Sequence, residues 1–170
     1  FSFYELFDNS KKYSKGVRVY EISTDDDPAY IRHMMEHKHS EGLIINGLGA
    51  GNIPDTLAKT VEAIVNSGKP VVVTSGPVEG DTNLEAYAVG LNSLRSGAIS
   101  GKDMTTEALY MKLAIALGTY PKSKDNKVSR MRMIRRFMDT RIAEEFSNNY
   151  IQTEYCAYNN LNEDIARQVA

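Results

Sequence analysis

The stretch that best fits a ligand-binding loop is Asn46-Gly-Leu-Gly-Ala-Gly-Asn52, which follows a short apolar run. Gly49 and Gly51 permit positive backbone φ angles, so the chain can turn tightly here between a strand and a helix. A dinucleotide fingerprint would need a further glycine at position 52, where the residue is Asn. Because the Asn52 amide can both donate and accept hydrogen bonds, Asn52 is the first candidate binding residue.

Glu85 is the second candidate, after Thr82-Asn-Leu. One interpretation is a solvated acid in the first turn of a helix. In the alternative interpretation its carboxylate reaches the ligand loop, where it would suit an ammonium group.

No metal site or catalytic nucleophile is predicted. His33 and His37 are four residues apart and would share a helix face, but no nearby acid completes a ligand set, so we interpret them and His39 as solvated. The acids at 25–27 are explained by helix capping. Ser75 has no histidine near it in sequence, and no Gly-x-Ser-x-Gly elbow is present. We therefore expect no cofactor.

Composition limits the class of protein. The 170 residues suffice for one globular domain, and the net charge of −2 does not predict a nucleic-acid partner. Cys156 is the single cysteine, which excludes an intrachain disulfide and fits a cytoplasmic location. No apolar run approaches the roughly 20 residues that cross a bilayer, so no membrane association is expected.

The elements that must position these residues alternate along the chain. Strands are expected at 17–22, 43–45, 70–75 and 97–100, and helices at 28–39, 54–67 and 105–117. This pattern predicts a three-layer α/β/α domain over residues 17–121, with a small parallel, flavodoxin-like sheet. In such sheets ligands bind at the carboxyl ends of the strands, where the loops at 47–52 and 74–85 would lie.

The flanking segments have a different character. Residues 1–16 are interpreted as a linker or strap, and residues 122–170 as a helical extension. Within the extension, residues 127–146 predict an amphipathic helix with Val128 and Ile134 on its apolar stripe. We interpret its basic side chains as one solvated face, with binding to nucleic acid or an acidic surface as the alternative.

Several segments, in the right order, are similar to one known family. They are Gly42–Pro54, Lys69–Ser75, Tyr87–Gly90 and Ser96–Gly118. They resemble the second domain of the L-asparaginases, including the carboxyl-terminal signature of that family. The resemblance covers about residues 17–137.

The resemblance implies a two-domain enzyme whose amino-terminal domain carries a Thr nucleophile, in a Thr-Gly-Gly-Thr-type motif that is absent here. It implies that Asn52, and by a weaker match Glu85, contact the substrate's α-amino side in a neighbouring subunit of a dimer or tetramer. The chain starts at Phe1, so we expect that the nucleophile's domain belongs upstream.

The leading hypothesis is the C-terminal domain of an amidohydrolase that converts L-asparagine to L-aspartate and ammonia. Under this hypothesis the chain alone is inactive and carries only part of the site for asparagine or aspartate, which the N-terminal domain completes. One alternative is a non-catalytic amino-acid-binding or dimerisation module. The other is an asparaginase-like subunit of a tRNA-dependent amidotransferase.

Overall fold

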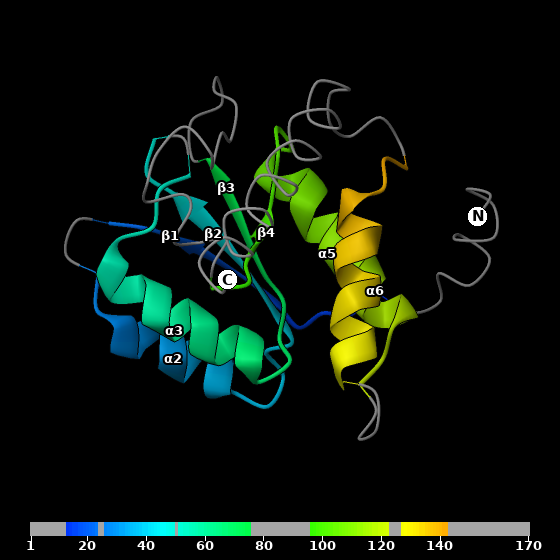
Figure 1. The fold of residues 1–170 in the computed structure, drawn as a ribbon, viewed down its shortest axis with the longest axis horizontal. Coiled ribbons are helices and arrows are strands. Elements are labelled where there is room, and N and C mark those ends of the chain that lie inside the picture. The colour runs from blue at the N-terminus through cyan, green and yellow to red at the C-terminus, as the bar shows by residue number, and fades with distance from the viewer. Residues whose placement is uncertain (1–12, 24–25, 50, 76–95, 123–126, 143–170) are drawn as a thin grey trace, which may run out of the picture.

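The computed structural model describes residues 13–23, 26–49, 51–75, 96–122 and 127–142, which form a parallel β-sheet with helices on both faces (Figure 1). The strands are β1 (Val17–Glu21), β2 (Gly42–Gly47), β3 (Val71–Ser75) and β4 (Ile99–Ser100). Each pairs in parallel with the next one along the chain. This confirms the predicted three-layer α/β/α architecture.

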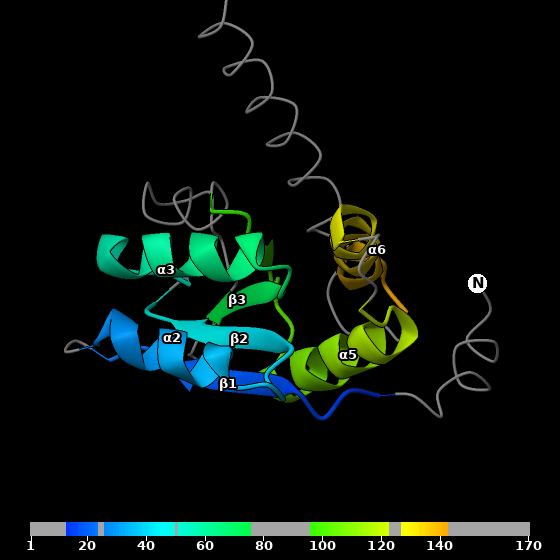
Figure 2. The same cartoon turned by 90° about the horizontal axis from the view of Figure 1, so that it is seen from below.

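Two helical layers enclose the sheet (Figure 2). The helices α2 (Pro28–Glu36) and α3 (Asp55–Asn66) cover one face, and α5 (Thr106–Thr119) and α6 (Lys127–Asp139) pack on the other. Leu43 and Ile45 join the core under α2 and α3, whereas Ile44 joins the core under α5. Successive side chains of a strand point to opposite faces, so β2 is buried on both sides and its sequence is continuously apolar.

The strand order differs from the flavodoxin-like order that we expected. A flavodoxin-like sheet has β1 between β2 and β3, whereas here the order is β1-β2-β3-β4. The reason lies in the crossovers. Both α2 and α3 pack against the same face, so each right-handed connection advances the chain by one strand in the same direction.

Local signals fix where the helices begin. The Asp27 side chain accepts a hydrogen bond from the Ala29 amide at 2.8 Å, and Pro28 opens α2. This confirms the capping interpretation for that acid. Thr105 caps α5 in the same way, accepting from the Ala108 amide at 3.3 Å. None of the described helices combines the length and the apolar character needed to span a bilayer.

The basic helix α6 corrects one expectation, because its cations do not form a single solvated face. Arg130 is only 3% exposed and donates from Nε to the Tyr120 carbonyl at 2.7 Å and from Nη1 to the Gly68 carbonyl at 3.1 Å. Arg135 donates to the Gly97 carbonyl at 2.7 Å. Val128, predicted to be on the apolar stripe, is 72% exposed instead.

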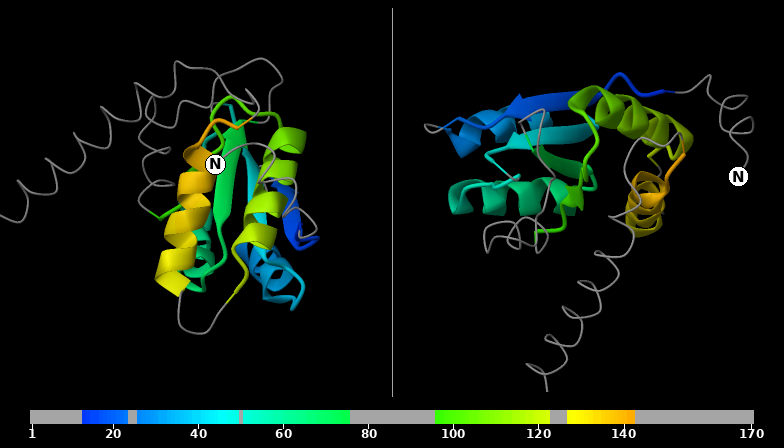
Figure 3. Two further views of the ribbon diagram at one scale, coloured as in Figure 1. Left: turned by 90° about the vertical axis from the view of Figure 1, so that its right-hand side faces the viewer. Right: turned by 90° about the horizontal axis from the view of Figure 1, so that it is seen from above.

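The physical reason is that helix ends and sheet edges leave carbonyl groups without partners. Lys127 bonds the Asn66 carbonyl in the last turn of α3, and Arg130 bonds the carbonyl of Tyr120, the residue that follows α5. Cations at these places also meet the negative ends of the helix dipoles. Figure 3 shows α6 running beside α5 on this side of the sheet. The rest of the predicted extension, 143–170, and the linker residues 1–12 lie outside the described residues.

Candidate functional site

The carboxyl ends of the parallel strands meet at one edge of the sheet, called here the carboxyl edge. Ligands of open α/β sheets bind at this edge. β2 ends there at Gly47, and α5 begins there with its amino terminus. Residues 76–95, which follow β3, fall outside the described part of the chain.

The glycine-rich loop after β2 folds back on itself in a small closed turn. The Leu48 amide donates to the Asn52 carbonyl at 3.0 Å, and the Asn52 amide donates to the Leu48 carbonyl at 2.9 Å. Gly49 and Gly51 have φ angles of 56° and 94°, in the region that favours glycine. At Gly47 a Cβ atom would lie 2.5 Å from the Gly51 carbonyl carbon, so the two backbones can approach this closely only without a side chain.

This turn holds the backbone of Asn52 but leaves its side chain without a hydrogen bond. Its backbone is fixed on one side by the two bonds to Leu48 and on the other by Ile53, which is buried in the core. The side chain is half-buried, and its amide has no hydrogen-bond partner among the described residues. The structure therefore presents an unengaged carboxamide from a hydrogen-bonded turn at the carboxyl edge, where ligands of such sheets bind. The ligand contact itself stays a prediction.

Sequence reasoning did not single out Asn46, a second asparagine at this edge. It is the polar residue of the otherwise apolar strand β2, and its Oδ1 accepts a hydrogen bond from Thr106 Oγ1 at 3.1 Å. Beside it on β3, buried Thr74 donates to the Met104 carbonyl at 3.4 Å. These bonds tie the start of α5 to the sheet. A polar residue near the end of an apolar strand is the sequence signal that could have identified Asn46.

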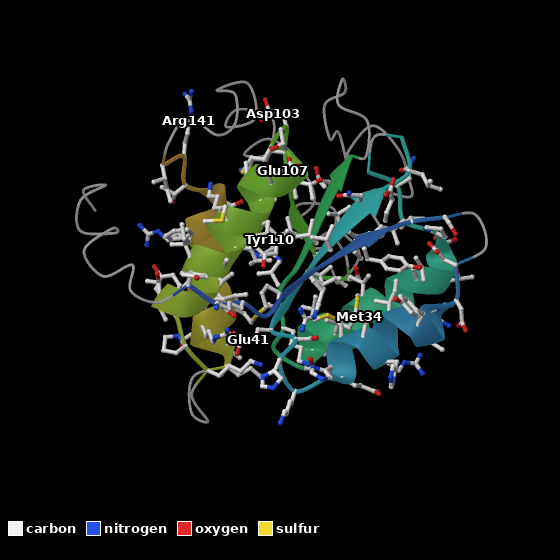
Figure 4. The ribbon with its side chains drawn as sticks, turned by 180° about the vertical axis from the view of Figure 1, so that it is seen from behind. Met34, Glu41, Asp103, Glu107, Tyr110 and Arg141 are labelled. Atoms are coloured by element: carbon white, nitrogen blue, oxygen red, sulfur yellow. The ribbon has the colours of Figure 1, made fainter. Side chains whose placement is uncertain are left out.

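Charged side chains of both signs lie at the carboxyl edge. Figure 4 shows Asp103 and Glu107 at this end of the molecule, just before and within the first turn of α5, and Arg141 beside them. Glu21 ends β1 at the same edge and is exposed. Lys102, between β4 and α5, pairs with Asp139 at 3.4 Å.

Tyr20 and Asp26 form a polar contact where β1 leads into α2. The Tyr20 hydroxyl donates to Asp26 Oδ1 at 2.6 Å, and the Ser23 amide donates to Asp26 Oδ2 at 2.9 Å. Burial raises the pKa of Tyr20 to about 12, and the hydrogen bond and negative charge of Asp26 add to the effect. The phenol therefore stays protonated to higher pH than an exposed tyrosine and keeps its hydrogen bond to Asp26.

Glu85 lies outside the described residues, so its contact with the substrate stays a prediction. His33, His37 and His39 are all exposed. Within the described ranges no group of three or more histidine, cysteine or acidic side chains is arranged to hold a metal ion.

Comparison with known proteins relates this geometry to one family. The family model described as the glutaminase/asparaginase C-terminal domain matches residues 16–130. A glutamyl-tRNA(Gln) amidotransferase subunit of Methanobrevibacter smithii is 33% identical over 123 residues, which are 71% of this chain and 26% of that protein. An L-asparaginase of Thermococcus kodakarensis is 34% identical over 112 residues, covering 65% of this chain and 32% of that protein.

Solved structures give the same relationship. The thermostable L-asparaginase from Thermococcus kodakarensis superimposes with a TM-score of 0.69 at 30% identity, covering 81% of this chain and 39% of that one. L-asparaginase I from Vibrio cholerae shares the fold, with a TM-score of 0.67 at 24% identity, covering 78% of this chain and 38% of that one. The chain thus spans between a quarter and two fifths of the length of these relatives.

Proposed function

Because the chain belongs to the glutaminase/asparaginase family and corresponds to its C-terminal domain, we propose that it supplies substrate contacts to an asparaginase-type amidohydrolase. The reaction is hydrolysis of the side-chain amide of L-asparagine to L-aspartate and ammonia. A Thr nucleophile on a separate amino-terminal domain attacks the amide and forms an acyl-enzyme, which water then cleaves. The present chain acts within a homo-oligomer and carries no nucleophile of its own.

The carboxamide of Asn52 is the observation that carries this proposal. The turn fixes its backbone, its side chain has no partner among the described residues, and it stands at the carboxyl edge. The amide oxygen can accept a bond from the substrate's ammonium group while the NH2 donates to its carboxylate. Glu85, if it reaches the same place, supplies the balancing negative charge and helps to reject analogues that lack the amino group.

The test uses a protein that contains both domains, expressed from the complete gene. Asn52→Ala removes a hydrogen bond to a charged substrate group, worth about 1.5–3 kcal/mol, so kcat/KM for asparagine should fall about ten- to a hundredfold. Asn66→Ala is the matched control, because Asn66 is exposed at the far end of α3. Equal activity of the Asn52→Ala variant and the unmodified enzyme would contradict the proposed contact.

A second candidate function is favoured by the identity to the amidotransferase subunits. Here the same domain would serve an enzyme that releases ammonia for use on a charged tRNA. Addition of glutamate-charged tRNA(Gln) and its partner subunit would then stimulate ammonia release, whereas a free-standing asparaginase would not respond. Calorimetric titration of the isolated domain distinguishes a non-catalytic amino-acid sensor from both enzymes. Only the sensor would bind asparagine or aspartate tightly without another domain.

A further inference from the structure

A lysine is buried at the carboxyl edge, and the proposed function gives it no role. Lys102 lies in residues 101–104, which join β4 to α5 and are called here the β4–α5 turn. Its side chain is only 2% exposed, although lysine is rarely so buried unless it is paired. Lys102 Nζ lies 3.4 Å from a carboxylate oxygen of Asp139, the last residue of α6. This ion pair therefore fastens the β4–α5 turn to the end of α6 that reaches the carboxyl edge (Figure 1).

The backbone of Lys102 is strained as well. Its φ angle is 56°, a left-handed value that no other described residue with a Cβ atom adopts. The turn keeps this shape through two bonds, from the Lys102 amide to Ser100 Oγ at 3.2 Å and from the Met104 amide to the Gly101 carbonyl at 3.2 Å. Such strain tends to occur at functional sites. A glycine would suit this backbone better, so it is the lysine side chain that accounts for the residue.

The β4–α5 turn is bonded to the carboxyl end of β3. The Gly101 amide donates to the Val73 carbonyl at 2.6 Å, and Thr74 Oγ1 donates to the Met104 carbonyl at 3.4 Å. A Cβ atom on Gly101 would lie 2.8 Å from the same Val73 oxygen, so the two backbones approach closely here. A shift of the turn would therefore be felt directly at the end of β3.

The same turn leads to the end of β2 through the start of α5. Thr106, the first residue of α5, donates from Oγ1 to Asn46 Oδ1 at 3.1 Å. Asn46 is followed by Gly47, where β2 ends and the closed turn that carries Asn52 begins. Energetic coupling between separate parts of a protein travels through contiguous contacts of this kind. An unbroken series of bonded residues thus connects Lys102 with the backbone of Asn52.

We propose that Lys102 is a positioning residue for substrate binding, whose ion pair with Asp139 holds the β4–α5 turn so that Thr106 and Asn46 keep the Asn52 carboxamide in place. The inference rests on the proposed function, because it concerns the same site. Lys102 does not touch the substrate and acts through the turn. Without its ammonium group the strained turn loses its attachment to α6 and relaxes toward an ordinary φ angle, which moves the start of α5.

Lys112 provides a matched control for a purely structural role. It is also buried, at 6% exposed, and it also fastens α5 to the end of α6, because its Nζ donates to the Thr140 carbonyl at 2.8 Å. Lys112 lies further along α5 than Thr106, away from the β4–α5 turn. If Lys102 only stabilised the fold, replacing either lysine by methionine should have the same consequences for the site.

Steady-state kinetics of a protein that contains both domains test the proposal. Lys102→Met removes the charge at similar length, so KM for asparagine should rise about three- to tenfold with kcat unchanged, the pattern of weakened ground-state binding. Asp139→Asn should raise KM in the same way, and the double variant should be no worse than either alone. Lys102→Arg, which keeps the charge, should recover part of the loss, and Lys112→Met should leave KM unchanged. An unchanged KM in Lys102→Met would overturn the inference, whereas a two-domain protein without asparaginase activity would contradict the proposed function.

Hydrogen exchange of the 170-residue chain decides the inference even if the two-domain protein is inactive. The amides of Leu48, Gly51 and Asn52 donate within the closed turn, so their exchange reports its local opening rather than global unfolding. In Lys102→Met these amides should exchange about tenfold faster, whereas in Lys112→Met they should stay within about twofold of the unmodified chain. Unchanged exchange in Lys102→Met, or equal acceleration in both variants, would overturn the positioning role.

Discussion

Replacing Arg130 by Met should destabilise the protein more than any other change among the cations of α6. Arg130 is almost fully buried and bonds two carbonyl groups, that of Tyr120 at 2.7 Å and that of Gly68 at 3.1 Å. Tyr120 is the residue that follows α5, and Gly68 lies just after the end of α3. One side chain therefore fastens α6 to two other helices.

The size of the stability loss follows from the hydrogen bonds that a Met side chain cannot make. Two hydrogen bonds from a charged donor contribute about 1.5–3 kcal/mol each, and the two carbonyls would lose these partners. Burial opposes the charge, because desolvation lowers the pKa of Arg130, and Met relieves that cost. The net loss should be about 2–4 kcal/mol of unfolding free energy. Arg130→Lys should recover less than half, since an ammonium cannot span both carbonyls as a guanidinium fork does.

Urea unfolding followed by circular dichroism measures the effect. Arg132→Met is the matched control, because Arg132 is exposed on the same helix, and it should change stability by about 0.5 kcal/mol or less. If Arg130→Met cost no more than Arg132→Met, the anchoring role would be refuted, and α6 would be a solvated basic helix after all.

Three further predictions concern residues near the carboxyl ends of β1 and β2. Gly47→Ala should destabilise the protein by about 1–3 kcal/mol, because the added Cβ would lie 2.5 Å from the Gly51 backbone, and urea unfolding checks this. Gly49→Ala should cost only about 1 kcal/mol, since it meets nothing within 4 Å and bears just the strain of a φ of 56°. In alkaline solution the pKa of Tyr20, raised from 10.0 to about 12, means that the folded state keeps a proton that the unfolded state releases. The free energy of unfolding should therefore fall as pH rises from about 10 to 12, and it should fall less in Tyr20→Phe. Urea unfolding at several pH values in that range measures this. The same pH dependence in both proteins would contradict the role of the bond from Tyr20 to Asp26.

The sheet and its helices were predictable from the sequence because their signals are local. Leu43–Ile45 is a short apolar run, which is typical of a strand buried on both faces. Asp27 and Pro28 are adjacent in sequence and together mark the start of α2. The glycines at 49 and 51 likewise predicted a tight turn, and the structure has positive φ at both.

The features that sequence reasoning missed depend on contacts between distant residues. Arg130 reaches Gly68 across 62 positions, so nothing near it in sequence marks it as buried. Asn46 is bonded by Thr106 across 60 positions, and its role at the carboxyl edge emerges only when β2 and α5 meet. Strand order was missed for the same reason, since it depends on which face each crossover helix covers.

Ammonia release by the purified 170-residue chain tests the central claim most directly. The chain presents Asn52 at the carboxyl edge, and we propose that the nucleophile belongs to another domain. With asparagine as substrate, release should therefore stay at the level of a blank, while a protein containing both domains is active. Release by the chain alone, abolished by Asn52→Ala, would contradict the proposal.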